Sequence, residues 1–197
     1  MLRIRLCREV MVLLVAFEFL FVVAVHAEDA ILEPPPGTEL VPSEELDGLK
    51  LKLFNNKFVI SAPSAEYRWV RTINRTPRAC YMCLNLKTES EAFSLFYSPK
   101  VNTEKFDEQF VKSFLDNVKK DLNERDGDLT DVVVQASDIP LKGKSYRATY
   151  AIKMPGREQR KRTVYYTAIE NCLIYFQGNG PESDGFKSFV TSFNSSK

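Results

Sequence analysis

A stripe of large apolar residues between residues 104 and 125 constrains the fold more than any other feature of the chain. Phe106, Phe110, Phe114, Val118 and Leu122 recur every four residues. This spacing is typical of one face of an amphipathic helix, and such a face has to cover another apolar surface. We therefore predict a helix from about Glu104 to Arg125 that packs against a sheet.

Stretches rich in Val, Thr, Tyr and Ile lie on both sides of this helix and have the composition of β-strands. In Ser145–Ile152, large side chains alternate with smaller or polar ones, which is typical of a half-buried strand. We predict strands at Lys57–Ala62, Tyr67–Ile73, Cys80–Leu86, Ala92–Ser98, Asp131–Gln135, Ser145–Ile152, Arg162–Ile169 and Cys172–Phe176. Short connections favour antiparallel pairing, because parallel neighbours need long crossovers.

A second helix is predicted from about Pro181 to Phe193. Phe186, Phe189, Val190 and Phe193 fall on one helical face, and a proline suits the first turn. The order of strands, helix, strands and helix predicts an α+β domain, in which two main helices cover a mostly antiparallel β-sheet.

The N-terminus has the features of an export signal. Basic residues precede the apolar run Val10–Val25, and small residues end the segment at Ala27. The run is shorter than the roughly 20 residues that span a membrane, and Glu18 interrupts it. We predict that residues 1–27 are a cleaved signal peptide and that the protein is secreted or periplasmic, with no stable membrane anchor. A retained anchor is the alternative.

Charge divides the remaining chain into two parts. Residues 28–48 hold 7 acidic residues, no basic ones and several prolines. Such a composition favours a flexible or extended tether, because it offers little apolar surface to bury. Residues 49–197 carry 24 basic and 17 acidic residues and form the predicted single α+β domain.

Several local strings resemble those of a known family. They are the segments 58–63 followed by Trp69, 110–114, 139–146 and 186–193. Together with the order of elements, they resemble the PsbP-like (Mog-like) α/β/α sandwich family, in particular its exported bacterial members, over roughly residues 55–193. The resemblance implies that fold and, by analogy, a binding or accessory role. It brings no catalytic or cofactor motif.

The single histidine, His26, lies inside the predicted signal peptide. A mature chain without histidine has no Ser-His-Asp triad, no Cys-His pair and no histidine metal ligand. Carboxylate pairs, Ser-Lys dyads and free thiols are not excluded in this way, but none of them has a local signature in the sequence. We therefore expect no catalytic residues, no cofactor and no metal site, and we interpret the protein as non-enzymatic.

Cys80 and Cys83 have the C-x-x-C spacing of redox dithiols. In a strand, however, residues three apart face opposite sides and lie about 10 Å apart. Two interpretations therefore stay open. Cys172 forms a disulfide with Cys80 or Cys83, which an exported protein permits, or all three thiols are reduced and mostly buried.

Arg157, Arg160, Lys161 and Arg162 form the densest basic group of the domain, after a Met-Pro-Gly turn at 154–156. We predict that they lie at the tip of a long hairpin and bind a partner there, either a protein or an anionic surface. The alternative is a solvated loop. Nucleic acid is not expected, because no aromatic residues are interleaved with the basic ones.

The leading functional hypothesis is thus an exported, non-enzymatic binding or accessory domain. Two alternatives belong to other classes. One is a thiol-disulfide redox protein that uses Cys80 and Cys83. The other is a carrier of a small ligand in a pocket between the sheet and a helix.

Overall fold

The computed structural model describes residues 34, 37–53, 57–73, 79–88, 91–99, 101–178, 180 and 182–195. The predicted signal peptide, residues 1–27, lies outside this range. Within the described residues, no helix has the length and apolar character needed to cross a membrane.

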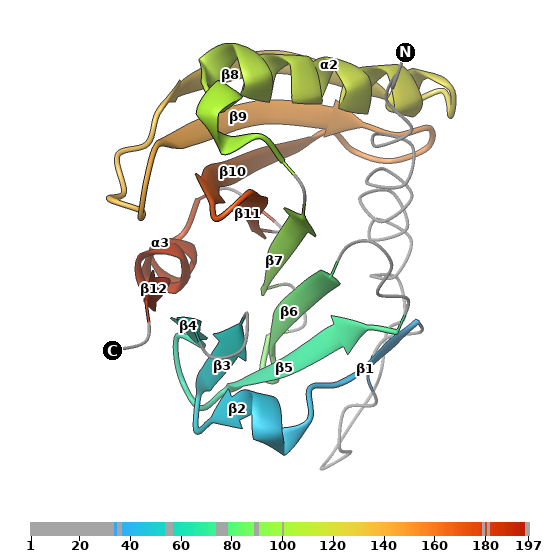
Figure 1. Cartoon of the computed structure of the whole chain (residues 1–197). Helices are drawn as coiled ribbons and strands as arrows, with labels where there is room; N and C mark the ends of the chain where they lie inside the picture. Colours follow the sequence, from blue (N-terminus) through green and yellow to red (C-terminus); the bar gives the residue numbers. More distant parts are fainter. Residues whose placement is uncertain are drawn as a thin grey trace.

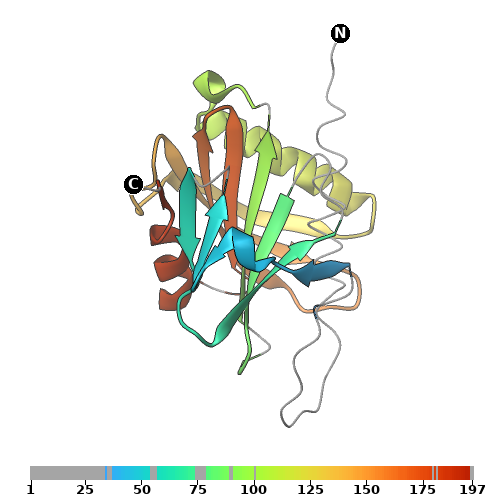
Figure 2. The same cartoon turned by 60° about the horizontal axis from the view of Figure 1, so that its bottom comes forward.

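The centre of the fold is an eight-stranded sheet with the spatial order β1-β5-β6-β7-β11-β10-β9-β8 (Figures 1 and 2). Its strands are β1 (Thr38–Leu40), β5 (Tyr67–Thr72), β6 (Ala79–Asn85), β7 (Ala92–Pro99), β8 (Asp128–Ala136), β9 (Ser145–Lys153), β10 (Arg160–Ile169) and β11 (Cys172–Gly178). Every neighbouring pair is antiparallel, as predicted.

A second, four-stranded sheet has the order β12-β4-β3-β2. Its strands are β2 (Leu46–Asp47), β3 (Lys50–Leu53), β4 (Phe58–Ser61) and β12 (Asn194–Ser195). β12, at the end of the chain, pairs with β4. Beside this pair, the backbone N–H of Ser61 donates to Ser192 Oγ at 2.9 Å across 131 positions of sequence. The last described strand is therefore joined to a strand from the first third of the chain.

The two predicted helices lie on opposite faces of the large sheet. α2 (Glu108–Asn123) packs on one face, where Val111, Leu115, Val118 and Leu122 are buried. α3 (Asp184–Thr191) and the small sheet cover the other face, where Phe186, Phe189 and Val190 are buried. The domain is thus an α+β sandwich, as predicted, with an apolar core on each side of the central sheet.

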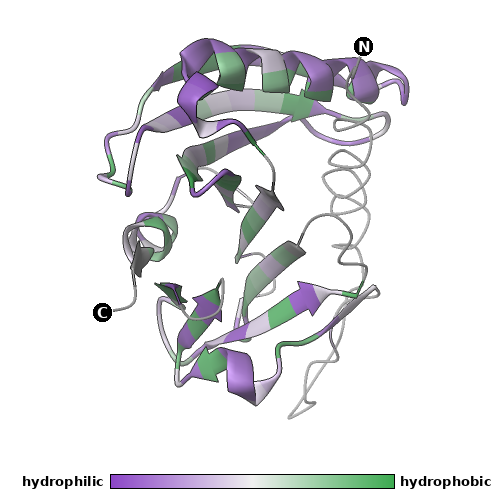
Figure 3. Ribbon diagram, viewed as in Figure 1, coloured by the Kyte–Doolittle hydropathy of each residue, from purple (hydrophilic) through white to green (hydrophobic). Residues whose placement is uncertain are grey.

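Capping residues explain where the helices begin. The side chain of Asp107 accepts from the backbone N–H of Phe110 at 2.7 Å, so α2 begins at Glu108. Glu104 and Lys105, which were predicted to open this helix, lie instead in the separate 3₁₀ turn η2 (Thr103–Lys105). Ser183 caps α3 in the same way. Figure 3 shows hydrophilic and hydrophobic residues alternating along α2, as expected for an amphipathic helix.

The predicted flexible tether over residues 28–48 is wrong for its described part. Residues 37–48, here called the strap, form β1, the 3₁₀ turn η1 (Ser43–Glu45) and β2, and so join the large sheet to the small one. Val41 is buried in the strap, and two strap carboxylates, Glu39 and Glu45, bind the guanidinium of Arg71. The acidic residues are therefore part of the domain, because a buried arginine on β5 needs them.

Candidate functional site

The predicted basic group lies on the β9–β10 hairpin. Arg160 and Lys161 are exposed at the start of β10, and Arg157 is half-buried in the connecting loop. The loop begins with a turn in which the N–H of Arg157 donates to the carbonyl of Met154 at 3.1 Å. Gly156 has a φ of 69°, which favours glycine at that place.

Arg162 does not belong to this exposed group, contrary to the prediction. It is only 4% exposed and lies on the same face of β10 as the buried residues Val164 and Tyr166. Its Nη1 donates to the carbonyl oxygen of Gly178 at 3.1 Å. Arg160, Lys161 and Arg162 are consecutive, and alternation places Arg160 and Arg162 on the same face of β10. Arg160 is exposed at the first position of the strand, whereas Arg162 lies further along it, where the face is covered. We call Arg160 and Lys161, together with the half-buried Arg157 of the connecting loop, the exposed basic group.

The hairpin loop is held against the neighbouring strand β8. Gln159 Nε2 donates to Thr130 Oγ1 at 3.3 Å, and β8 and β9 pair directly from Asp128 opposite Lys153. Because its base is a paired two-strand ribbon, the hairpin presents its charges from a fixed backbone rather than from a free loop.

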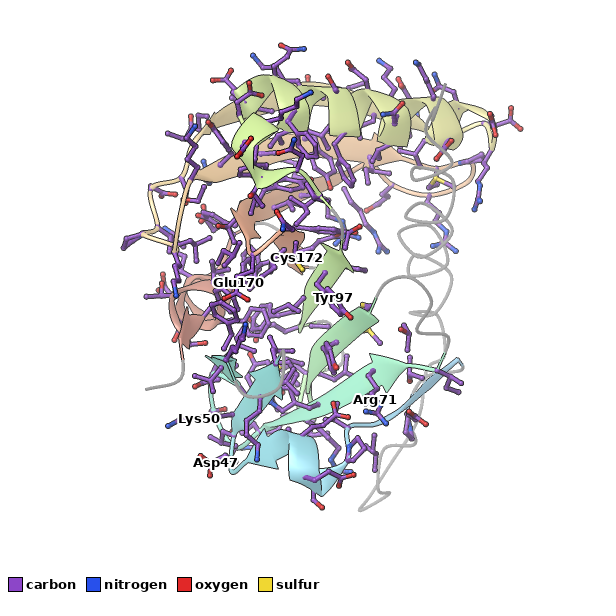
Figure 4. The ribbon with its side chains drawn as sticks, in the orientation of Figure 1. Asp47, Lys50, Arg71, Tyr97, Glu170 and Cys172 are labelled. Carbon is purple, nitrogen blue, oxygen red and sulfur yellow. The ribbon has the colours of Figure 1, made fainter. Side chains whose placement is uncertain are left out.

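Cys80, Cys83 and Cys172, the cysteines in the part of the chain that the structure describes, are free thiols. The predicted disulfide of Cys172 with Cys80 or Cys83 is therefore not formed in this structure. The register explains this result. Cys80 on β6 lies opposite Phe96, and Cys172 on β11 lies opposite Pro99, so the strand β7 separates them. Two strand spacings amount to about 10 Å, beyond the roughly 7 Å between Cα atoms that a disulfide spans. Figure 4 shows Cys172 beside Glu170.

The C-x-x-C pair also has the wrong geometry and chemistry for a redox site. Cys80 is buried in the core beside α2, whereas Cys83 is buried in the core beside α3, on the opposite face of the sheet. Burial raises the pKa of both thiols far above the ordinary value. A redox cysteine needs a lowered pKa and access to solvent, so this arrangement argues against that alternative.

Sequence reasoning missed a polar cluster at the beginning of α3. Arg147 Nη2 donates to Glu182 Oε2 at 2.6 Å, and the Tyr165 hydroxyl contacts both Glu182 and Asp138 Oδ1, the latter at 3.1 Å. Burial and the neighbouring Glu182 carboxylate raise the pKa of Tyr165. The hydroxyl therefore stays neutral, and the cluster joins β9, β10 and the two loops that carry Asp138 and Glu182.

A second polar group continues this cluster towards β5. The Tyr67 hydroxyl donates to Glu91 Oε2 at 2.6 Å, and Ser183 Oγ donates to Glu91 Oε1 at 3.2 Å. Burial, followed by the hydrogen bond to Glu91, raises the pKa of Tyr67 to about 12. Both polar groups consist of residues far apart in sequence, so no local motif could have revealed them.

Aromatic side chains fill the space between α2 and the sheet, where a ligand pocket was one of the predicted alternatives. The Phe114 ring of α2 lies 5.9 Å from those of Tyr166 and Tyr175, and Phe96 stacks on Tyr175 at 4.7 Å. Within the described part of the chain, no group of three or more His, Cys, Asp or Glu residues could hold a metal ion. The exposed basic group is the candidate site that the sequence analysis named for a partner.

Comparison with known proteins supports the fold. The solution structure of cyanobacterial PsbP (CyanoP) from Synechocystis sp. PCC 6803 matches with a TM-score of 0.58, covering 88% of this chain and 99% of that one. The chain has a PsbP-like fold. The resemblance and the fold class predicted from the sequence are thereby confirmed. Sequence identity to CyanoP is 13%, so the PsbP-like likeness concerns the fold alone. No family model and no curated protein matches the chain.

Proposed function

We propose that this PsbP-like chain is an exported, non-enzymatic binding domain that contacts an anionic partner through the exposed basic group. The observation that carries the proposal is the different placement of the arginines. Arg71, Arg147 and Arg162 are engaged by protein acceptors, whereas Arg160 and Lys161 point to solvent. Exposed charges on a paired hairpin are suited to attracting an oppositely charged partner.

The proposal of export rests on residues 1–27, whose order of basic, apolar and small residues is that of a signal peptide. Mass spectrometry of secreted protein tests it: a mature chain that begins at Glu28 is expected. A mass that still includes residues 1–27 would contradict cleavage.

The role of the exposed basic group can be tested with polyglutamate immobilised on a biosensor. The variant Arg157→Gln/Arg160→Gln/Lys161→Gln removes three charges from the hairpin and leaves the buried Arg162 intact. A matched control, Lys105→Gln/Lys120→Gln/Lys187→Gln, removes three exposed charges elsewhere on the domain. If the proposal is right, the hairpin variant loses binding and the control retains it.

Two results would contradict this role. Equal losses in the two variants would show that net charge alone is responsible. Binding that survives in the hairpin variant would exclude the exposed basic group. Binding of the native chain should also weaken as salt is raised, because solvent-exposed charges are screened.

A further inference from the structure

β8 differs from the other edge strands of the described sheets. The edges β1, β2 and β12 are 3, 2 and 2 residues long, whereas β8 has 9 residues and pairs only with β9. A long edge offers a row of backbone N–H and C=O groups to another strand. Proteins usually protect such edges by shortness, a bulge, a proline or an inward-facing charge.

Only the first half of β8 has such protection. A register shift between Thr130 and Val133 interrupts its pairing with β9, and Asp131 within the shift has a φ of 55°. From Val133 to Ala136 the register is continuous, and these residues include no charge, lysine or proline. Val133 is 53% exposed. The second half of β8 is thus an unprotected edge.

We propose that Val133–Ala136 of β8 receives an extended segment of a partner protein as an added antiparallel strand. Backbone hydrogen bonds would supply the affinity, and an apolar side chain beside Val133 would supply contact area. A partner strand antiparallel to β8 continues towards Asp128, where the β9–β10 hairpin begins.

The charge of the partner segment follows from the hairpin and rests on the function proposed above. Gln159 binds Thr130, so the loop that carries Arg157 lies against the first half of β8. Lys119 lies 3.8 Å from Asp128 and offsets its charge. The segment we expect is therefore apolar where it pairs with Val133–Ala136 and acidic at its C-terminal end, where it meets the exposed basic group.

A synthetic probe can test this pairing without altering the protein. The probe is a fluorescein-labelled peptide in which four alternating Thr and Val residues precede four Glu residues. Two further peptides carry N-methyl groups, one on the Thr amides and the other on the Val amides. Successive N–H groups of a strand point to opposite edges, so only one of these peptides loses its bonds to β8.

Fluorescence anisotropy with the full chain should show that one methylated peptide binds about tenfold more weakly and that the other binds like the parent peptide. Val133→Lys, at an exposed position, should weaken binding by a similar factor. Leu40→Lys, at a 45% exposed position on the opposite edge β1, is the matched control and should have no effect.

Equal binding of the two methylated peptides, or native affinity in Val133→Lys, would overturn strand addition at β8. A dimer in sedimentation velocity that Val133→Lys abolishes would also overturn it, because a second copy of the chain would then occupy the edge. A further peptide with Lys in place of Glu separates this proposal from the function proposed above. If it binds as well as the parent peptide and one methylated form still binds more weakly, strand addition at β8 is retained. The role proposed for the exposed basic group is then contradicted.

Discussion

Arg162 and Gly178 are joined between β10 and β11, where the guanidinium Nη1 donates to the glycine carbonyl at 3.1 Å. The bond holds a cation that is 4% exposed on the α2 side of the sheet. Its neighbours Arg160 and Lys161 are exposed. Of these three adjacent basic residues, Arg162 is bound inside the domain, whereas Arg160 and Lys161 lie at the surface.

This difference predicts unequal effects of the same substitution. Arg162→Gln should lower the free energy of unfolding by about 2 kcal/mol, because a hydrogen bond from a buried charged group is lost. Arg160→Gln should change it by less than about 0.5 kcal/mol, as exposed substitutions usually do. Urea unfolding followed by circular dichroism measures both values. Equal stabilities of the two variants would show that Arg162 has no structural role.

The thiols should differ in reactivity. Burial raises the pKa of all three thiols, but Cys80 and Cys83 are buried, whereas Cys172 is only partly buried and can be reached by a reagent. Iodoacetamide at pH 8 should therefore modify Cys172 first in the native protein, and all three residues in urea. Peptide mapping identifies the modified residues. Rapid native labelling of Cys80 or Cys83, or insulin reduction that Cys80→Ser abolishes, would instead favour the redox alternative.

The stability of the domain should fall more when the strap carboxylates are removed than when the arginine that they bind is removed. Glu39→Gln/Glu45→Gln leaves the guanidinium of Arg71 buried without its carboxylates and should cost about 3 kcal/mol. Arg71→Met should cost less, about 1 kcal/mol, because the glutamates can turn to water. Urea unfolding gives the comparison. A larger loss of unfolding free energy in Arg71→Met would contradict this explanation. The strap carboxylates would then not serve to offset the cost of burying the Arg71 charge.

Alkaline pH should weaken the anchoring of α3. The pKa of Tyr67 is about 12 in the folded protein, against an ordinary value of 10.0. Because the folded state holds this proton more tightly, the stability that it provides is complete below about pH 10 and is lost as the pH rises towards 12. The Tyr67→Phe variant should therefore lose less stability between pH 9 and pH 11.5 than the native chain. Urea unfolding measures both stabilities. If the native chain and Tyr67→Phe lose the same free energy of unfolding across that range, the pH dependence does not come from Tyr67.

Periodicity was sufficient to locate most of the domain. The alternation in Ser145–Ile152 and the four-residue spacing before Leu122 correspond to β9 and α2. Both patterns are local, because each reports one element with one buried face. The short strands β1, β2, β3 and β12 have too few residues to show a period, so the strap and most of the small sheet were missed.

The candidate site was predictable only in part. The basic residues at 157–161 were found from composition, but the burial of Arg162 depends on which face of β10 is covered. The separation of Cys80 from Cys172 depends on the order of strands, which places β7 between them. The bond between Arg147 and Glu182 links residues 35 positions apart. Each of these features is a property of topology, which a local pattern does not contain.

The hydrogen bond between Ser61 and Ser192 has a consequence for how the molecule forms. The residues are 131 positions apart, and β4 gains its partner β12 only when the last residues of the chain are available. Contacts over such distances slow folding, because a long loop has to close before they contribute stability. A nascent chain that lacks its C-terminus cannot complete the small sheet.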